Sequence, residues 1–220
     1  MHNLCKLFSL LQLTKDQPLS GYLLGGIKLG ETSTLAEHHY TAALMGWLVT
    51  EEIKQGGGTI NERKVVLGLL IHDLSELFGG DISGPINRKY PELRQLKDKI
   101  GERAISVLTD YLSPPAARSF KALWHELAQA QTDEAIVVKI IDQMDHQFFL
   151  EYHNYQQRHS NDGAGEINNY RPKFVKQHIF ELVPKIKNPR TRRVVQEFLD
   201  EFKRNFFNRG YQGMQILMEE

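Results

Sequence analysis

Residues 65–81 read VVLGLLIHDLSELFGGD, the most informative segment of the chain. Its opening part, residues 65–71, is an uncharged apolar run, and the ionisable pair His72 and Asp73 follows at once. A segment that is apolar nearly all round is typical of a helix at the centre of a fold. The pattern therefore predicts one central helix over residues 62–78, with both ionisable side chains near its middle. Because an uncompensated buried ionic group is costly, these two side chains require a partner.

The segments on either side of this stretch also have a helical period, and the chain has no convincing alternation of period two. Thr34 and Glu37 have the spacing of a capping box, which predicts a helix that begins at Thr34 and runs to the stop Gly56-Gly57-Gly58. Thr132 is expected to cap a long helix that runs through Phe148. Four further helices are predicted over residues 91–112, 116–128, 173–186 and 189–208. The fold class predicted from these patterns is all-α.

The clearest predicted loop is HSNDGAGEINNYRP, residues 159–172, because Ser, Asn, Asp, Gly and Pro dominate it. The chain length favours a single domain over residues 1–220. Within it we expect a core over residues 18–158, then this loop, and then a C-terminal helical extension over residues 173–220 that adds two helices.

The composition excludes several classes of partner. The 27 basic residues balance 27 acidic ones, which argues against a protein that binds nucleic acid through an overall positive field. No apolar run approaches the roughly 20 residues that span a bilayer, so no membrane partner is expected. The N-terminal apolar stretch is interrupted by Lys6 and Gln12 and is not interpreted as a signal peptide. The single cysteine, Cys5, excludes an intrachain disulfide and a cysteine-based zinc cluster, and it fits a reducing, cytoplasmic setting.

Four side chains supply the imidazole and carboxylate donors that suit a divalent first-row metal ion. They are His38, His72, Asp73 and Asp142. Adjacent helical positions point about 100° apart, so the HD pair can meet at one ion, and Glu76 stands one turn further along the same face. The alternative is a buried His–Asp pair held by hydrogen bonds without a metal. His39, next to His38, is a second candidate for the first imidazole ligand.

The ordered pattern H…HD…D resembles the signature of the HD-domain metal-dependent phosphohydrolases, and its details are similar to the 5'-deoxynucleotidase branch. The matching strings are AEHHY at residues 36–40, HDLSE followed by GGD at residues 72–81, WHE at residues 124–126, and TDEA at residues 132–135 leading into Asp142. The resemblance covers residues 18–150, and several ordered motifs at compatible spacing make it specific.

The resemblance implies an all-α HD-domain helical bundle that hydrolyses a phosphate monoester, typically a deoxynucleoside 5'-monophosphate. It implies one divalent ion (Mn, Co, Ni, Zn, Mg or Fe) bound by His38, His72, Asp73 and Asp142. A metal ion makes a neighbouring water more acidic, and a nearby carboxylate takes or relays the proton. Glu76 is the first choice for that carboxylate and Asp81 the second. The alternative role for Glu76 is to orient His72.

The chain departs from the family where the phosphate is held. Gly25 stands where members of this branch present an arginine, and Lys28 is expected to supply a cation there instead. Trp124 and Glu126 are further candidates for contact with the substrate. This departure keeps two alternatives open: hydrolysis of a nucleoside triphosphate or of a non-nucleotide phosphoester, and a catalytically silent module that binds metal or nucleotide. Apolar residues near the C-terminus favour a homodimer, among them Phe206, Phe207, Ile216 and Leu217.

Overall fold

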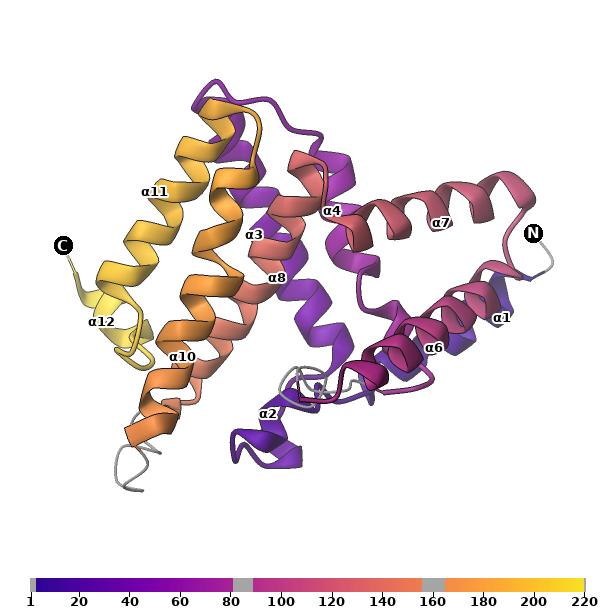
Figure 1. Ribbon diagram of the computed structural model, residues 1–220, viewed down its shortest axis with the longest axis horizontal. Coiled ribbons are helices and arrows are strands. Elements are labelled where there is room, and N and C mark those ends of the chain that lie inside the picture. Colours follow the sequence, from indigo (N-terminus) through magenta and orange to yellow (C-terminus); the bar gives the residue numbers. More distant parts are fainter. Residues whose placement is uncertain (1–2, 81–88, 156–164, 220) are drawn as a thin grey trace. The chain divides into compact units, whose positions relative to one another are not determined.

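A computed structural model describes residues 3–80, 89–155 and 165–219, and helices dominate these ranges (Figure 1). The α-helices are α1 (Leu4–Leu11), α2 (Gly21–Leu24), α3 (Leu35–Gln55), α4 (Glu62–Ile71), α6 (Pro91–Thr109), α7 (Pro114–Gln129), α8 (Asp133–Tyr152), α10 (Gly165–His178), α11 (Pro189–Asn205) and α12 (Gly213–Met218). The 3-10 turns are η1 (Gln12–Lys15), η2 (Leu29–Glu31), η3 (Leu74–Glu76) and η4 (Phe180–Lys185). Extended pairing in the described ranges is limited to one antiparallel bridge between Pro18 and Thr34. The all-α prediction is confirmed.

The two capped helices begin where their sequences predict. At the start of α3, the Thr34 N–H donates to Oε2 of Glu37 at 2.8 Å, and the Glu37 N–H donates to Oγ1 of Thr34 at 3.3 Å. At the start of α8, Oγ1 of Thr132 accepts a hydrogen bond from the Ala135 N–H at 3.2 Å. Each bond satisfies an amide that a helix N-terminus leaves without an intrahelical acceptor.

The central helix predicted over residues 62–78 is interrupted, which corrects the sequence interpretation. The α4 helix ends just before His72 and η3 begins just after Asp73, so the HD pair lies in the turn between them. Nδ1 of His72 lies 2.9 Å from the carbonyl oxygen of Leu69, the atom that would accept the Asp73 N–H if the helix continued. Asp73 accordingly has φ −101° and ψ 7°, outside the helical region. The His72 side chain thus contacts the Leu69 carbonyl at the point where the helix ends.

The loop predicted over residues 159–172 is wrong from Gly165 onward, because α10 begins there and includes Pro172. Residues 159–164 of that prediction lie outside the described part of the chain. The helix is anchored from its interior: the buried Arg171 forms an ion pair with Glu151 of α8 at 2.7 Å. This contact between distant parts of the sequence outweighs the local turn-forming composition.

The chain forms two compact units. The first unit contains residues 1–43 and 67–128, and the second contains residues 44–66 and 129–220. The core of the first unit includes Leu7, Leu19, Ile27, Leu35, Leu69, Leu74, Leu77, Ile105 and Leu108. The core of the second unit includes Ile53, Ile136, Val137, Ile140, Ile141, Met144, Ile179, Val183, Ile186, Val195, Leu199 and Phe202. The predicted C-terminal extension, residues 173–220, thus packs with α8 in the second unit.

Polar contacts join α8 to the segments that follow it in the second unit, where α10 and α11 run beside it (Figure 1). Asp133 accepts hydrogen bonds from the backbone N–H groups of Lys187 and Asn188 at 2.7 and 2.9 Å, which ties the start of α11 to the start of α8. At the other end, Glu151 accepts the N–H groups of Asn208 and Gly210 at 2.8 and 2.7 Å. Both ends of α11 are therefore held against α8 by hydrogen bonds.

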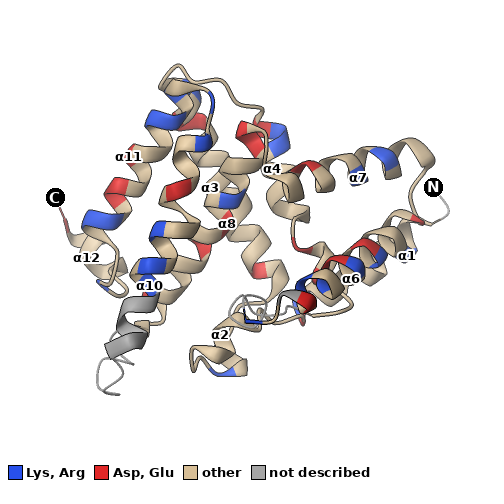
Figure 2. Cartoon of the chain, viewed as in Figure 1, with Lys and Arg blue, Asp and Glu red and all other residues tan. Residues whose placement is uncertain are grey.

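Acidic and basic residues are interspersed along α6, whereas α11 carries a basic group at its start, an acidic group in its middle and a basic group at its end (Figure 2). This arrangement agrees with the balanced composition of the chain. None of the helices in the described ranges combines the length and the apolar composition of a membrane span.

Candidate metal centre

Three of the four predicted metal ligands meet inside the first unit. His38 projects from the first turn of α3 and is fully buried, while His72 and Asp73 follow α4. The two Nε2 atoms of the histidines lie 3.2 Å apart. Oδ2 of Asp73 lies 3.2 Å from Nε2 of His72 and 3.9 Å from Nε2 of His38. Two imidazoles and one carboxylate therefore face a common point.

The hydrogen bond between His72 and the Leu69 carbonyl determines which ring nitrogen carries the proton. A carbonyl only accepts, so Nδ1 is the donor at 2.9 Å, and in the neutral ring Nε2 then presents a lone pair toward His38. Nitrogens this close share either one proton or one cation. Nitrogen and oxygen ligands about 2.0–2.2 Å from a zinc ion lie roughly 3–3.5 Å from each other, so these residues fit a divalent metal ion.

Asp142, the fourth predicted ligand, lies on α8 in the second unit and is largely buried. Its two carboxylate oxygens have different neighbours within its own helix. Nε2 of Gln143 donates to Oδ2 at 2.8 Å, and Nε2 of His146 lies 3.3 Å from Oδ1. His146 is thus the near neighbour of Oδ1, one helical turn after Asp142.

The two predicted proton carriers have different outcomes. Glu76 ends η3 with its side chain 9 % exposed, and Oε1 lies 2.6 Å from Nζ of Lys97 on α6. Asp81 lies outside the described residues. The sequence interpretation missed Lys97, because a lysine on an amphipathic helix carries no motif. Its only signal is the position of its ammonium group once α6 has packed on η3.

The predicted substrate-binding residues remain predictions. Lys28 is exposed just before η2, and Gly25 ends the short helix α2. Trp124 of α7 has a packing role, because its ring lies 3.8 Å from the position that a Cβ on Gly101 would occupy. Glu126 is half-buried on the same helix.

His39, the alternative to His38, also lies near the donor cluster. Its ring centroid is 5.1 Å from that of His72. The nitrogen that faces Nε2 of His72 at 3.2 Å nevertheless belongs to His38. The donor cluster therefore contains the histidine that the AEH string favours.

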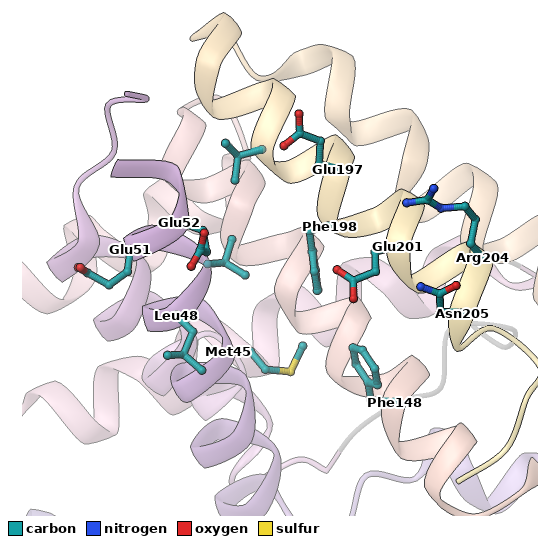
Figure 3. Close-up of a pocket in the computed structure, with 12 residues that line it drawn as sticks. Met45, Leu48, Glu51, Glu52, Phe148, Glu197, Phe198, Glu201, Arg204 and Asn205 are labelled. Carbon is teal, nitrogen blue, oxygen red and sulfur yellow. The ribbon is translucent and has the colours of Figure 1, made fainter. Parts of the chain in front are cut away.

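A groove in the second unit, formed by α3, α8 and α11, contains none of the predicted site residues (Figure 3). It encloses about 1090 Å³. Its floor is apolar, with Met45, Phe148 and Phe198, while Glu52 and Glu201 point toward its interior. Carboxylates repel an anionic phosphate. The donor cluster, and not this groove, is the candidate site.

The first turn of α3 and the HD pair after α4 bring two imidazoles and one carboxylate together. This arrangement is that of a helical protein with a candidate metal site. The HD domain family matches residues 14–171. This chain belongs to the HD domain family.

The chain is also similar in sequence to curated proteins named 5'-deoxynucleotidases. The chain is 27 % identical over 160 residues to "5'-deoxynucleotidase HDDC2" of Dictyostelium discoideum, which covers 72 % of this chain and 80 % of that protein. It is 30 % identical over 112 residues to a 5'-deoxynucleotidase of Vibrio cholerae, which covers 50 % of this chain and 57 % of that one.

Solved structures share the fold. A conserved hypothetical protein from Pyrococcus furiosus is 25 % identical with a TM-score of 0.65, over 91 % of this chain and 99 % of that one. A predicted metal-dependent phosphohydrolase from Magnetospirillum magnetotacticum is 20 % identical with a TM-score of 0.61, over 92 % of each chain.

Proposed function

We propose that this chain is a metal-dependent phosphohydrolase that releases phosphate from a (deoxy)nucleoside 5'-monophosphate. The observation that carries the proposal is the meeting of His38, His72 and Asp73 at 3.2 to 3.9 Å. Membership of the HD domain family supports the reaction class. The relatives named as 5'-deoxynucleotidases support the substrate class.

Asp142 is proposed as the fourth ligand. Support comes from its place in the ordered pattern and from the Gln143 amide, which donates to Oδ2 at 2.8 Å. The donors are nitrogen and oxygen only, and neutral imidazole with carboxylate suits divalent first-row ions. When bound, such an ion supplies Lewis acidity, which polarises the phosphoryl group and makes a nearby water more acidic.

Glu76 is proposed to take the proton of the attacking water. As the water oxygen bonds to phosphorus, the bond from phosphorus to the ester oxygen breaks. The water proton passes to the Glu76 carboxylate, and the departing nucleoside oxygen is protonated from solvent. Lys97, whose Nζ lies 2.6 Å from Oε1 of Glu76, favours the ionised form of the Glu76 carboxylate that this role requires. Asp81 is proposed to assist from the segment after η3.

Lys28, Trp124 and Glu126 are proposed to contact the substrate. A lysine ammonium holds a phosphate as a point charge, without the paired geometry of a guanidinium. An aromatic ring such as Trp124 offers a face on which a base stacks. With Gly25 in place of the family arginine, the phosphate is held by fewer fixed donors.

The proposal is tested with protein stripped of metal and reloaded separately with Mn, Co, Ni, Zn, Mg or Fe. Each sample is incubated with deoxynucleoside and nucleoside 5'-monophosphates and with the corresponding triphosphates. Release of inorganic phosphate from monophosphates alone is expected. Release of di- or triphosphate from the triphosphates would replace this function with nucleoside triphosphate hydrolysis, and no turnover with any metal would indicate a silent module. Glu201→Gln, in the groove of the second unit, is the matched control and should leave turnover unchanged.

A homodimer in a reducing, cytoplasmic compartment is also proposed. Ile216 and Leu217 on α12 are 51 % and 79 % exposed, which supports an intermolecular contact. Phe206 and Phe207 are instead half-buried within the second unit. Light scattering of the native chain and of Leu217→Asp tests the dimer. A native mass of one chain would contradict it.

A further inference from the structure

Glu76, the carboxylate proposed to take the proton, contacts Lys97, a residue that belongs to no recognised sequence motif. Nζ of Lys97 on α6 lies 2.6 Å from Oε1 of Glu76. The Glu76 side chain is 9 % exposed and that of Lys97 is 29 % exposed, so this contact is largely shielded from water. A charge-assisted hydrogen bond in such surroundings fixes the orientation of the Glu76 carboxylate as well as stabilising its negative charge.

The packing of α6 against the η3 region shows that Lys97 is not an incidental neighbour. Gly101 follows Lys97 by one helical turn, and a Cβ there would lie 3.1 Å from Cβ of Ser75. A Cβ on Gly79 would lie only 2.5 Å from Cγ2 of Ile100. Residues one turn apart share a helix face. The face of α6 that packs on η3 at Gly101 therefore also carries the ammonium group.

We propose that Lys97 is a positioning residue for the hydrolytic reaction. Its hydrogen bond to Oε1 sets the direction in which the second oxygen of Glu76 points, and that oxygen receives the proton of the water. This inference rests on the proposed function.

The need for such a residue follows from local structure. Glu76 has three rotatable side-chain bonds and stands at the end of a short 3-10 turn rather than inside a long helix. A catalytic group displaced by about 1 Å can cost on the order of 100-fold in rate. The contact with α6 supplies the constraint that the short turn lacks.

The test compares the metal-loaded full-length protein with Lys97→Met and Lys97→Arg. In Lys97→Met, kcat should fall about 10- to 100-fold while KM stays within about twofold and bound metal is unchanged. Lys97→Arg should restore most of kcat, because a guanidinium also donates to the carboxylate. In a Glu76→Gln background, Lys97→Met should have no further effect, because Lys97 acts through Glu76. Lys99→Met, on the same helix and exposed, is the matched control.

Three results would overturn the inference: native kcat in Lys97→Met, a rise in KM alone, or an equal loss of kcat in the Glu76→Gln background. The second result would instead make Lys97 a phosphate-binding residue. If the native chain hydrolyses no phosphate ester with any metal, the proposed function fails separately. The melting temperatures of metal-free Lys97→Met, Glu76→Gln and the double variant then decide whether Lys97 and Glu76 are coupled. If the decreases in melting temperature add in the double variant, the inference is contradicted. If the double variant is as stable as the less stable of the two single variants, the pairing is supported.

Discussion

Nε2 of His38 at the start of α3 and Nε2 of His72 after α4 face each other at 3.2 Å. The two residues are separated by 34 positions in sequence. His38 is positioned by the capped N-terminus of α3, and His72 is positioned by the C-terminal end of α4. Because His72 bonds through Nδ1 to the Leu69 carbonyl, its other nitrogen is turned toward His38. The interruption of α4 is thus part of how the donor cluster is built.

Loss of either residue of the HD pair should abolish metal retention. His72→Ala removes one donor and also the side chain that ends α4, whereas Asp73→Ala removes a carboxylate alone. Metal content after purification and dialysis should fall at least about tenfold in each variant, because ligand removal costs more than the 10- to 100-fold effect of removing a supporting partner. Elemental analysis measures the content. His125→Ala, an exposed histidine on α7, should keep the native amount, and full metal content in either HD variant would disprove the ligand set.

Glu76→Gln should separate binding from chemistry. The amide keeps the size of the side chain and cannot act as a base at neutral pH. Turnover should fall by about two to four orders of magnitude, the usual contribution of a positioned general base. Metal content should match that of the native chain. If the metal is lost together with activity, Glu76 instead orients His72, which is the alternative that the sequence left open.

The parts of the fold that sequence could predict are those fixed by local chemistry. Thr34 and Thr132 cap the helices that follow them, because an N-cap needs only residues within one turn. The choice of His72 and Asp73 as candidate donors followed from residue type, since an apolar run that ends in these two residues requires a partner for both.

The parts that sequence missed depend on contacts with distant residues. The start of α10 could not be read from a stretch rich in turn-forming residues, because Arg171 is anchored by Glu151 of another helix. The role of Lys97 likewise depends on the approach of α6 to η3, which periodicity does not reveal. The end of α4 coincides with the contact between Nδ1 of His72 and the Leu69 carbonyl, which the sequence pattern does not reveal.

Thr34→Ala should weaken both the fold and the metal site. Thr34 and Glu37 exchange hydrogen bonds at the start of α3, and His38 lies in the same turn. Loss of an N-cap costs about 1 kcal/mol, which urea unfolding of the metal-free protein measures. A frayed first turn also positions His38 less well, so metal affinity should fall with stability. Thr34→Ser keeps the capping oxygen and should resemble the native chain in both measurements. Unchanged affinity in a destabilised Thr34→Ala protein would show that His38 is held by its burial alone.

Glu151→Gln should be the more destabilising change, although Glu151 is not among the predicted metal ligands. Burial lowers the pKa of Arg171, and the neighbouring Glu151 carboxylate opposes that shift by favouring the charged guanidinium. Without the carboxylate, a buried cation loses its counter-charge, and breaking such a pair typically costs about 3–5 kcal/mol. Urea unfolding monitored by circular dichroism gives the value.

The double variant Glu151→Gln with Arg171→Met distinguishes this electrostatic cause from simple loss of packing. In the native chain the Asn208 N–H donates to Oε1 of Glu151 and the Gly210 N–H donates to Oε2. Glutamine keeps only one acceptor oxygen, so one of these two bonds is lost in both the single and the double variant, and that loss cancels when the two variants are compared. Removing the guanidinium then removes the uncompensated charge, so the double variant should be more stable than Glu151→Gln alone. A loss equal to the sum of the two single losses would contradict the electrostatic explanation. In that case the bonds from Arg171 to Gln147 and Asn208 would carry the stability of this end of the second unit.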